Sequence, residues 1–460
     1  MNTLPESVVQ QIVKEVTARL NMQSTSNGVF TTMEEAVAAA KTAQQTVKNM
    51  PMQQREKIIS AIRQATLENA ETFARLAVEE TGMGNVPHKI LKHKLVAEKT
   101  PGTEDITTRA FSGDNGLTLV EMSPFGVIGA ITPCTNPSET IICNTIGMLA
   151  GGNTVVFNPH PAAIKTSMFA VEMINRASVS VGGVANIATT VQKPTIETGN
   201  AMMKHPDIAL LVATGGPGLV TAVLSSGKRG IGAGAGNPPV LVDETADVRK
   251  AAQDIVDGAT FDNNLPCIAE KVIVAVEAIA DKLMACMVNE QNCYYANAAE
   301  LKKLEAVVFN GKGLNRKCVG KSATDILQMI GVIAPTGTRC IVFEGAKEHP
   351  FIDEELMMPI LGMVRVSGFN EGIKTAVWLE HGYRHSAHIH STNVKRITEY
   401  AKALDTAILV KNAPSYAALG FGGEGYCTFT IASRTGEGLT SAASFTKQRR
   451  CVMSESLCIR

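Results

Sequence analysis

The sequence contains no run of about 18 apolar residues, the length that a membrane-spanning helix needs, and no excess of charge of either sign. Its 43 Lys and Arg residues balance 43 Asp and Glu residues, and no long basic block occurs. Nucleic acid and anionic membrane are therefore poor candidates for its partners. The first residues also lack a basic segment followed by an apolar one, so we expect an intracellular, cytoplasmic protein.

None of the ten cysteines forms a C-x-x-C pair, which argues against a zinc site and against a thioredoxin-like motif. Ten thiols without a disulfide framework suit a reducing compartment. One of them stands in the polar turn 261–271, after a predicted helix at 246–259 and directly before the apolar run 272–276, which indicates a strand. A thiol in such a turn is accessible, so Cys267 is a candidate nucleophile, although most cysteines are small buried hydrophobes.

Residues 1–22 are predicted to form a separate amphipathic helix. Thr3 and Glu6 fit a capping box, and the residues at 23–28 are small and polar, as in a linker. This helix is either an ordinary one docked on the body or a recognition peptide whose apolar face awaits a partner. Its apolar side chains fall on one side at helical spacing, namely Val9, Ile12, Val13, Val16 and Leu20.

With 460 residues the chain is long enough for two or three domains. Thr32 and Glu35 fit a second capping box, which starts an Ala-rich helix, and residues 55–80 are predicted to continue as helix. Strands and helices then alternate, and a second alternating unit begins at Val240. This pattern predicts parallel, doubly wound sheets, which bind ligands beyond the carboxyl ends of their strands. The predicted strands are 117–122, 126–131, 154–157, 186–191, 208–213, 240–242, 272–276, 339–343 and 407–410.

The predicted strand at 208–213 ends in a glycine-rich turn, 214–218, and residues 219–226 are predicted to form a helix. A strand, a glycine turn and a helix N-terminus make an anion site, because bare backbone N–H groups and the positive end of the helix dipole face the anion. We therefore predict phosphate binding at this turn, with a simple tight turn as the alternative. A second glycine cluster, 420–425, matches G-x-G-x-x-G, but a strand-like sequence follows it instead of the helix that the dinucleotide fingerprint requires.

Short motifs follow one another along residues 29–460, namely Ser123-Pro124-Phe125-Gly126-Val127-Ile128, Thr135-Asn136-Pro137, Thr214-Gly215-Gly216-Pro217-Gly218, Gly234-Ala235-Gly236-Asn237-Pro238-Pro239, the Cys267 turn and Glu355-Leu356-Met357-Met358-Pro359. Together they resemble the aldehyde dehydrogenase superfamily and, more closely, its CoA-acylating branch from bacterial microcompartments. The resemblance implies an α/β aldehyde dehydrogenase fold with two doubly wound Rossmann-like domains, a small oligomerisation arm and an N-terminal amphipathic helix.

The resemblance also implies a homodimer or homotetramer. Residues 1–22 resemble the encapsulation peptides of enzymes packed inside such compartments, which implies a location in the compartment lumen and a partner in its shell or core. The implied division of the chain is a dinucleotide-binding domain at 29–105 and 127–239, a catalytic domain at 240–438, and an oligomerisation arm at 106–126 and 439–460.

Matched position by position, Cys267 corresponds to the family nucleophile and Asn136 to the side chain that helps to hold the oxyanion. Glu355 matches the acid near the nicotinamide ribose, and His385 resembles a histidine associated with the CoA half-reaction. A structural role for His385 stays open, because three more histidines crowd its segment. The expected NAD-binding positions are Thr214, Gly215, Gly216, Pro217 and Gly218, together with Thr135, Pro159 and His160.

One departure from the hydrolytic aldehyde dehydrogenases bears on the reaction. Those enzymes use a glutamate to activate water, whereas the corresponding segment 234–239 has no carboxylate. A thioester at Cys267 can then wait for a thiol, so we expect a short aliphatic aldehyde as substrate, NAD as oxidant and CoA as co-substrate, with propionaldehyde favoured over acetaldehyde. A second departure concerns the adenosine ribose, where Asn158-Pro159-His160-Pro161 replaces the usual Lys-Pro segment.

Three rival interpretations stay open. Cys134, two residues before Asn136, is the nearest competitor as nucleophile, although a small residue packed near the pocket is its simpler interpretation. Hydrolytic oxidation to the carboxylic acid is a second enzymatic hypothesis, and an inactive cargo or scaffold protein is one of another class. We expect no metal, because no cysteine or carboxylate completes the histidine-rich segment 381–390.

Overall fold

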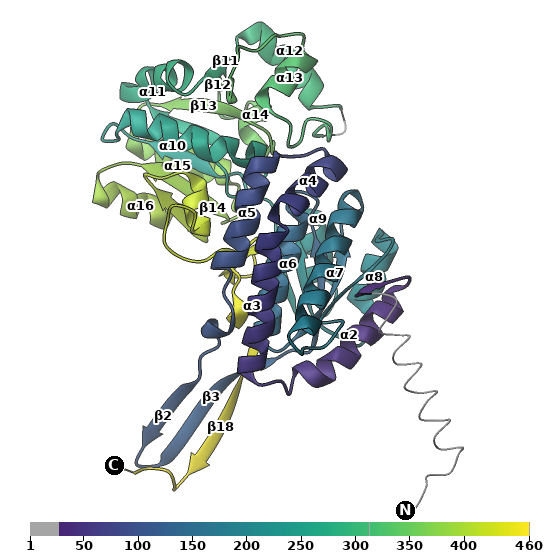
Figure 1. Ribbon diagram of the computed structural model, residues 1–460. Coiled ribbons are helices and arrows are strands. Elements are labelled where there is room, and N and C mark those ends of the chain that lie inside the picture. Colours follow the sequence, from purple (N-terminus) through teal and green to yellow (C-terminus); the bar gives the residue numbers. More distant parts are fainter. Residues whose placement is uncertain (1–26, 312, 460) are drawn as a thin grey trace, which may run out of the picture.

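The computed structural model describes residues 27–311 and 313–459, so the predicted helix at 1–22 lies outside the described residues. The described chain forms two α/β lobes and a three-stranded arm that projects from the first lobe (Figure 1). This arrangement confirms the predicted α/β class with two parallel sheets. In the part of the chain that is described, no helix combines the length and the apolar character needed to cross a membrane.

The first lobe is built on a six-stranded parallel sheet in the order β1-β6-β5-β4-β7-β8. The chain runs outward from β4 through β5 to β6 and then returns to place β7 and β8 on the other side of β4, so the sheet is doubly wound. Helices α2, α8 and α9 cover one face of the sheet, and α6 and α7 cover the other. Helix α3 packs on the outside of α6 and α7. The strands are β1 (Val29–Phe30), β4 (Val127–Thr132), β5 (Thr154–Pro159), β6 (Ala188–Val191), β7 (Ile208–Thr214) and β8 (Gly230–Ala233).

The helices of this lobe are α2 (Met33–Val47), α3 (Met52–Glu68), α4 (Ala70–Thr81), α5 (Val86–Lys99), α6 (Pro137–Ala150), α7 (Ile164–Ser180), α8 (Ile196–Lys204) and α9 (Pro217–Leu224). The predicted capping box at the start of α2 is confirmed, since the Thr32 hydroxyl accepts from the Glu35 N–H and the Glu35 carboxylate accepts from the Thr32 N–H. Helix α6 is buried along its whole length between the sheet and the outer helices. It is the helix that carries Asn136 at its N-terminus.

The second lobe contains a seven-stranded parallel sheet in the order β11-β12-β13-β10-β9-β14-β15. Helices α10 and α11 pack on one face, while α12 to α16 pack on the other. The strands are β9 (Pro239–Val242), β10 (Val272–Val276), β11 (Cys293–Tyr295), β12 (Cys340–Glu344), β13 (Ile360–Val366), β14 (Ser386–His390) and β15 (Ile408–Lys411). The helices are α10 (Val248–Thr260), α11 (Glu277–Asn289), α12 (Ala298–Val308), α13 (Ala323–Met329), α14 (Pro350–Asp353), α15 (Phe369–Glu380) and α16 (Val394–Leu404).

The arm is an antiparallel sheet in which β3 (Gly116–Pro124) lies between β2 (Arg109–Gly113) and β18 (Thr446–Ser454). It therefore joins a segment that precedes β4 to the end of the described chain (Figure 1). Phe445, just before β18, is buried in the first lobe, so the projecting part begins at about β18. A further antiparallel pair is formed by β16 (Ile431–Ala432) and β17 (Gly438–Leu439).

One helix prediction was wrong, and one helix was missed. Residues 55–80 do not form one helix, because Asn69 leaves the helical conformation with φ −104° and ψ 7°, and its side-chain Nδ2 donates to the Ala65 carbonyl at 2.8 Å. Helix α5 was not predicted at all. Its buried positions carry two lysines and a histidine beside three apolar residues, so it lacks the apolar periodicity that indicates a helix.

The strand-like sequence after the glycine cluster 420–425 is a strand only at β16. Just before β16, the Phe429 N–H donates to the sulfur of Cys143 in α6 at 3.4 Å, and the Thr430 hydroxyl donates to Asn144 Oδ1 at 3.0 Å. Contacts with a helix have therefore taken the place of a sheet partner at these residues. The described residues directly after the cluster form no helix, so the rejection of a dinucleotide fingerprint there is confirmed.

The turn between α4 and α5 packs against the turn that precedes Cys267. Gly84 has a φ of 78°, and a Cβ built on it would lie 2.2 Å from Oδ1 of Asp262. The neighbouring Asn85 N–H donates to the same oxygen at 2.9 Å. Both the backbone conformation and this close approach therefore require glycine at position 84.

We expect Gly84→Ala to lower the melting temperature more than Gly182→Ala does. Gly182 is a matched control, because its φ is also 78° but a Cβ built on it would meet nothing within 4 Å. Each substitution forces alanine into the left-handed region at a cost of about 1–2 kcal/mol. Only Gly84→Ala also displaces the Asp262 carboxylate, and breaking such buried contacts adds about 1–3 kcal/mol. Thermal unfolding followed by circular dichroism measures the difference, and equal losses would contradict the prediction.

Candidate active site

A cavity of about 710 Å³ lies at the carboxyl ends of the first sheet, where parallel doubly wound sheets bind their ligands. Four strands of that sheet reach its wall with their last residues, Thr132 of β4, Pro159 of β5, Thr214 of β7 and Ala233 of β8. The second lobe contributes Cys267 and His385 to the same wall. The two lobes thus face each other across one cavity.

The cavity brings together nearly all the catalytic and cofactor-binding residues that were predicted from the sequence. Pro217 is the exception: it does not line the cavity but occupies the first turn of α9, as its fixed φ suits. The nominated residues in the wall are Thr135, Asn136, Pro159, His160, Thr214, Gly215, Gly216, Gly218, Cys267, Glu355 and His385.

The glycine turn after β7 forms an open cradle at the start of α9. Gly216 is the N-cap residue, and no side chain caps the helix there. A Cβ built on Gly216 or Gly218 would meet nothing within 4 Å, so both glycines border free space. The first N–H groups of a helix lack partners within that helix. This turn therefore fits a pyrophosphate group.

The backbone before Cys267 adopts an unusual conformation. Asp262, Asn263 and Asn264 have φ values of 48°, 55° and 67°, in the left-handed region that Asn and Asp tolerate better than most residues. The Asp262 N–H donates to His88 Nδ1 at 2.9 Å, and Asn263 Nδ2 donates to the Gly320 carbonyl at 2.9 Å. The Asn264 amide donates to two further backbone carbonyls at 2.8 and 3.0 Å. These contacts hold the turn, and with it the position of the thiol.

The Cys267 thiol is half-buried in the cavity wall. Burial and, after it, the nearby Glu355 carboxylate raise the pKa of this thiol to about 12, while Lys271 opposes them. The thiol is therefore protonated at neutral pH in the free protein, and a thiolate forms only when the surroundings change or a base removes the proton.

Lys271 is a buried cation behind the thiol. Its Nζ donates to the backbone carbonyl of Asn264 at 2.9 Å and to Asn264 Oδ1 at 2.6 Å, and it lies 3.8 Å from Glu355 Oε1. Burial lowers the pKa of Lys271 and raises that of Glu355, while their mutual attraction opposes both shifts. Neutralising Glu355 would leave Lys271 as the nearest charge and would favour the thiolate.

The Asn136 side chain has two different ends. Its Oδ1 accepts from Lys92 Nζ at 2.5 Å, and its Nδ2 makes one long contact to Thr135 Oγ1 at 3.3 Å. Because Asn136 lines the cavity with Cys267, the weakly bonded NH₂ group is the end available to a ligand. A donor in this position suits an oxyanion.

His385 is buried at the start of β14. Its Nδ1 contacts Ser386 Oγ at 2.9 Å, and its buried Nε2 has no hydrogen-bond partner among the described residues. Burial and, after it, the Lys271 cation lower the pKa of His385 to about 4. The imidazole is therefore neutral at pH 7, and His385 is among the residues that line the cavity.

The other histidines of this segment make structural contacts and do not line the cavity. His381 Nε2 bonds to the Asp353 backbone carbonyl at 2.8 Å, and His388 Nε2 bonds to the Ile268 carbonyl at 2.9 Å. Within residues 27–311 and 313–459 no group of three or more His, Cys, Asp or Glu side chains is arranged to hold a metal ion.

Among the described residues that line the cavity, Glu355 is the sole carboxylate. The segment 234–239, which was expected to lack a water-activating acid, places Gly234 and Ala235 in the wall. Asn237 turns away, and its Nδ2 donates to three backbone carbonyls at 3.0, 3.2 and 3.3 Å. The segment 234–239 therefore offers an attacking water neither a carboxylate nor a free amide.

Cys134 is a second half-buried thiol in the wall. Burial raises its pKa, and Arg316 and Lys89 oppose the shift. Its presence beside the same cavity makes it a natural control for Cys267.

Residues 10–441 match the aldehyde dehydrogenase family. The chain belongs to this family. Among its curated relatives, the propanal dehydrogenase (CoA-propanoylating) of Citrobacter freundii is 44% identical over 100% of both chains. The acetaldehyde dehydrogenase (acetylating) of Escherichia coli K12 is 46% identical over 97% of this chain and 98% of its own.

The chain is also similar to solved structures of aldehyde dehydrogenases. A propionaldehyde dehydrogenase from the fucose utilisation microcompartment of Clostridium phytofermentans is 74% identical, with a TM-score of 0.94 over 94% of this chain and 100% of that one. A propionaldehyde dehydrogenase of Rhodopseudomonas palustris, solved with bound CoA and an acylated cysteine, is 56% identical, with a TM-score of 0.93 over 95% of this chain and 100% of that one.

The sequence analysis did not identify several residues of the site. Lys89 and Lys92 lie on the unpredicted helix α5, Asp262 was treated only as part of the turn, and Lys271 only as the residue before a strand. One signal was present: Lys89, Lys92 and Val96 recur at helical spacing after Asn85, an N-cap residue type. That spacing indicates a helix face, but it does not say that the face is buried.

We expect the alkylation of Cys267 by iodoacetamide to quicken about tenfold per pH unit from pH 7 to pH 9.5, without a plateau, because only the thiolate reacts and its pKa lies far above this range. Glu355→Gln removes a charge that raises this pKa and should quicken alkylation at any one pH. Peptide mass spectrometry separates Cys267 from Cys134 and supplies the rates. A plateau below pH 8 would contradict the raised pKa.

Proposed function

We propose that the protein is an NAD-dependent, CoA-acylating aldehyde dehydrogenase that converts propionaldehyde, CoA and NAD to propionyl-CoA and NADH. One observation carries this proposal: the Cys267 thiol shares a cavity with a pyrophosphate cradle, and Glu355 is the sole carboxylate among the described residues that line it. The similarity to CoA-propanoylating relatives over the full length supports the same reaction.

In the first half-reaction the Cys267 thiol loses its proton to water as its sulfur attacks the aldehyde carbon, and the carbonyl π electrons move onto the oxygen. The negative charge that develops on the carbonyl oxygen is held by the Asn136 Nδ2 group and the Cys267 backbone N–H. NAD, when bound, supplies the hydride acceptor. Cys267 is left as an acyl thioester. Among the described residues that line the cavity the sole carboxylate is Glu355, which lies 3.8 Å from Lys271, so we expect slow hydrolysis of the thioester.

In the second half-reaction CoA takes the acyl group from Cys267. His385 is proposed to accept a hydrogen bond from the CoA thiol through its unpartnered Nε2, which helps the sulfur to attack the thioester. The Cys267 thiol regains its proton as CoA leaves with the acyl group. Its high pKa favours this step, since the protonated form is the stable one in the free protein.

For the cofactor, residues 29–105 and 127–239 are proposed as the dinucleotide-binding domain and 240–438 as the catalytic domain. Thr214, Gly215 and Gly216 would hold the pyrophosphate, with Gly218 leaving room beside it and Pro217 starting the helix behind it. Glu355 would bond the nicotinamide ribose. Thr135, Pro159 and His160 would complete the wall of the cofactor site.

Propionaldehyde is the favoured substrate and acetaldehyde the second candidate, because relatives of both kinds are similarly close. One methylene in an apolar pocket is worth about 1–3 kcal/mol of discrimination. Both aldehydes are therefore included in the assay that follows.

We expect Cys267→Ala to abolish the formation of acyl-CoA and NADH, and Cys134→Ala to keep most of both. With the unmodified protein, NADH formation should continue only while CoA is present, and propionaldehyde should give a kcat/KM at least equal to that for acetaldehyde. Absorbance at 340 nm reports NADH, and mass spectrometry separates acyl-CoA from free acid. Steady production of free acid without CoA would favour the hydrolytic rival, and loss of activity in Cys134→Ala alone would overturn the assignment of the nucleophile.

For the cellular location, residues 1–22 are proposed as an encapsulation peptide that binds the shell or core of a bacterial microcompartment in the cytoplasm. A structural neighbour that is 74% identical comes from such a compartment, which supports this proposal. The amphipathic pattern of the segment supplies an apolar face for the partner.

Deletion of residues 1–22 should leave kcat and KM unchanged in solution and should remove the protein from purified microcompartments. Immunoblots of the compartment fraction measure the second effect, and the full-length chain is the control. Loss of activity in solution would instead favour a helix that docks on the body.

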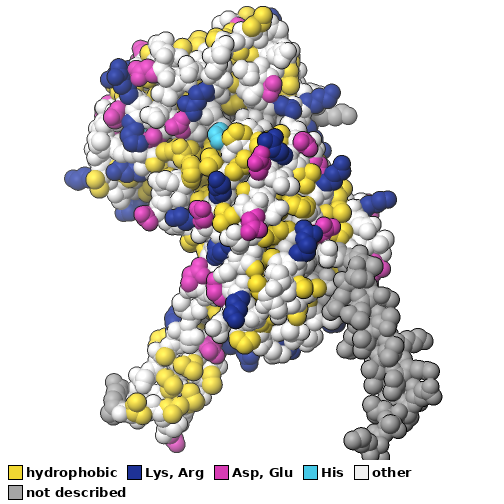
Figure 2. All heavy atoms as spheres, viewed as in Figure 1, with side chains coloured by type: hydrophobic (Ala, Val, Ile, Leu, Met, Phe, Trp, Pro, Cys, Tyr) yellow, Lys and Arg dark blue, Asp and Glu magenta, His cyan; other side chains and the backbone are white. Residues whose placement is uncertain are grey.

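The arm, 106–126 and 439–460, is proposed to join two subunits in a homodimer or homotetramer. Apolar side chains gather on the visible face of the arm (Figure 2). Phe111 of β2 is 57% exposed and Val452 of β18 is 61% exposed, although both lie in strands. Residues of this kind on a projecting sheet suit contact with another subunit.

A further inference from the structure

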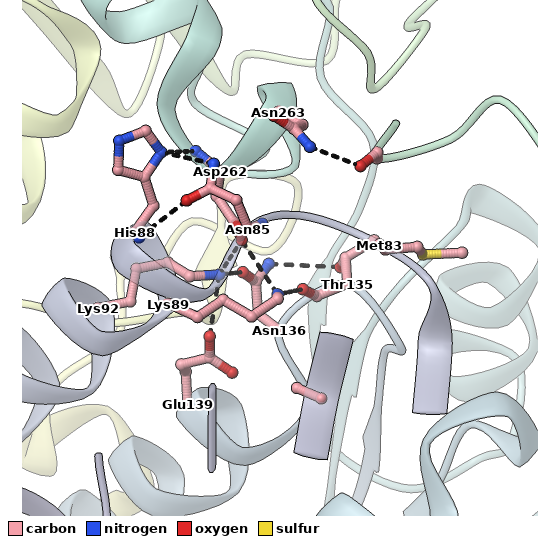
Figure 3. A network of polar contacts seen from close by, with 12 residues as sticks. Met83, Asn85, His88, Lys89, Lys92, Thr135, Asn136, Glu139, Asp262 and Asn263 are labelled. Carbon is pink, nitrogen blue, oxygen red and sulfur yellow. Dashed lines mark hydrogen bonds and ion pairs between the residues drawn. The ribbon is translucent and has the colours of Figure 1, made fainter. Parts of the chain in front are cut away.

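Behind Asn136 lies a buried cluster of charged side chains (Figure 3). At its centre is Lys92 of α5, whose side chain has no exposed surface. Lys92 Nζ lies 2.5 Å from Asn136 Oδ1, 2.5 Å from Asp262 Oδ2 and 2.9 Å from Glu139 Oε1. The contact with Asn136 is a hydrogen bond, and the contacts with the two carboxylates are ion pairs.

The two carboxylates keep Lys92 charged. Burial by itself lowers the pKa of Lys92, but the Asp262 carboxylate and then the Glu139 carboxylate outweigh burial and raise this pKa above its usual range. A second buried lysine, Lys89, lies 3.0 Å from the same Asp262 oxygen, so two cations face two carboxylates. The ammonium of Lys92 is therefore a permanent donor across the physiological pH range.

This permanent donor distinguishes the two ends of the Asn136 amide. An ammonium only donates, so it binds the Oδ1 end and would be left facing N–H groups if the amide turned over. The Nδ2 end then points away from Lys92, and its contact with Thr135 Oγ1 is long at 3.3 Å. Its remaining N–H capacity is free for a ligand of the cavity.

We propose that Lys92 is a positioning residue that holds the Asn136 amide with its NH₂ group toward the oxyanion formed at Cys267. The proposal rests on the function proposed above, in which Asn136 is an oxyanion donor. Lys92 itself is buried behind Asn136 and is not among the residues that line the cavity. It acts by keeping one orientation of the amide before the substrate arrives, so no reorientation is needed as charge develops.

A purely structural role for the cluster is the alternative, and Lys89 is the matched control for it. Lys89 belongs to the same helix, is equally buried and shares Asp262 with Lys92. Its Nζ donates to the backbone carbonyl of Thr135 at 3.2 Å and to Asp262 Oδ2 at 3.0 Å, whereas among the described residues it is Lys92 that donates to the Asn136 side chain. Loss of Lys89 therefore weakens the cluster without freeing the amide.

The test compares Lys92→Met, Lys89→Met, Asn136→Ala and the double variant Lys92→Met/Asn136→Ala. The rate of the first NADH burst with propionaldehyde measures acylation of Cys267, and thermal unfolding measures stability. We expect Asn136→Ala to slow acylation about 100-fold, the range for loss of one oxyanion donor. Lys92→Met should slow it at least tenfold with little change in the KM for aldehyde, and should add less than twofold in the Asn136→Ala background.

Two results would overturn the proposal. If Lys92→Met and Asn136→Ala multiply in the double variant, or if Lys89→Met slows acylation as much as Lys92→Met, the effect does not pass through the amide. An Asn136→Ala variant with an unchanged burst would remove the oxyanion role of Asn136 as well, while the burst itself would still demonstrate the proposed reaction.

Loss of Lys92 leaves a buried carboxylate unpaired, which can prevent folding. For that case the charge-balanced variant Lys92→Met/Glu139→Leu removes one cation together with one carboxylate, and Glu139→Leu alone is its control. If acylation is slower in Lys92→Met/Glu139→Leu than in Glu139→Leu, the proposal is supported. Equal rates in the two variants overturn it.

Discussion

The Asp262 carboxylate is the group on which the arrangement of the site depends, because it is buried and stands in the turn that carries the candidate nucleophile. It receives the Asn85 N–H and lies within ion-pair distance of Lys89 and Lys92, all on or beside α5. A buried carboxylate without partners is too costly to persist, so this turn of the second lobe is stable only against the first lobe. Through Lys92 the same contact reaches Asn136 at the start of α6. Three segments that are distant in sequence are thus fixed relative to one another.

Around this contact each of the two doubly wound sheets contributes different groups to the site. The first sheet ends in the glycine cradle and in the strand ends that border the cavity, while the second lobe supplies the thiol and the neutral His385. A cavity between them can hold a cofactor against the thiol and can admit a second co-substrate when the cofactor leaves. Several side-chain contacts hold the backbone turn that precedes Cys267. The thiol is therefore in position before the substrate binds, and no conformational entropy is lost in ordering it during the reaction.

The stability of the thioester toward hydrolysis depends on whether the cavity wall carries a base that can activate water. The segment 234–239 presents Gly234 and Ala235 to the cavity and uses Asn237 to bond backbone carbonyls. Glu355, the carboxylate in the wall, lies 3.8 Å from Lys271. The high pKa of the Cys267 thiol stabilises the protonated product of the transfer, but it also makes this sulfur a poorer leaving group than a more acidic thiol would be. Transfer from Cys267 therefore benefits from a hydrogen bond to the incoming thiol, which is the role proposed for His385.

Much of this protein was determined by local sequence. The apolar run 272–276 predicted β10 with the observed bounds, the capping box at Thr32 predicted the start of α2, and the turn after β7 predicted the open N-terminus of α9. These features are local because caps, glycine turns and apolar periodicity act between residues only a few positions apart. The break at Asn69 and the whole of α5 were not predictable in the same way. Helix α5 buries lysines, and the Lys89 ammonium reaches Asp262 across 173 positions of sequence. Only the tertiary structure brings those partners together, because a buried charge is stable only where folding supplies its counter-charge.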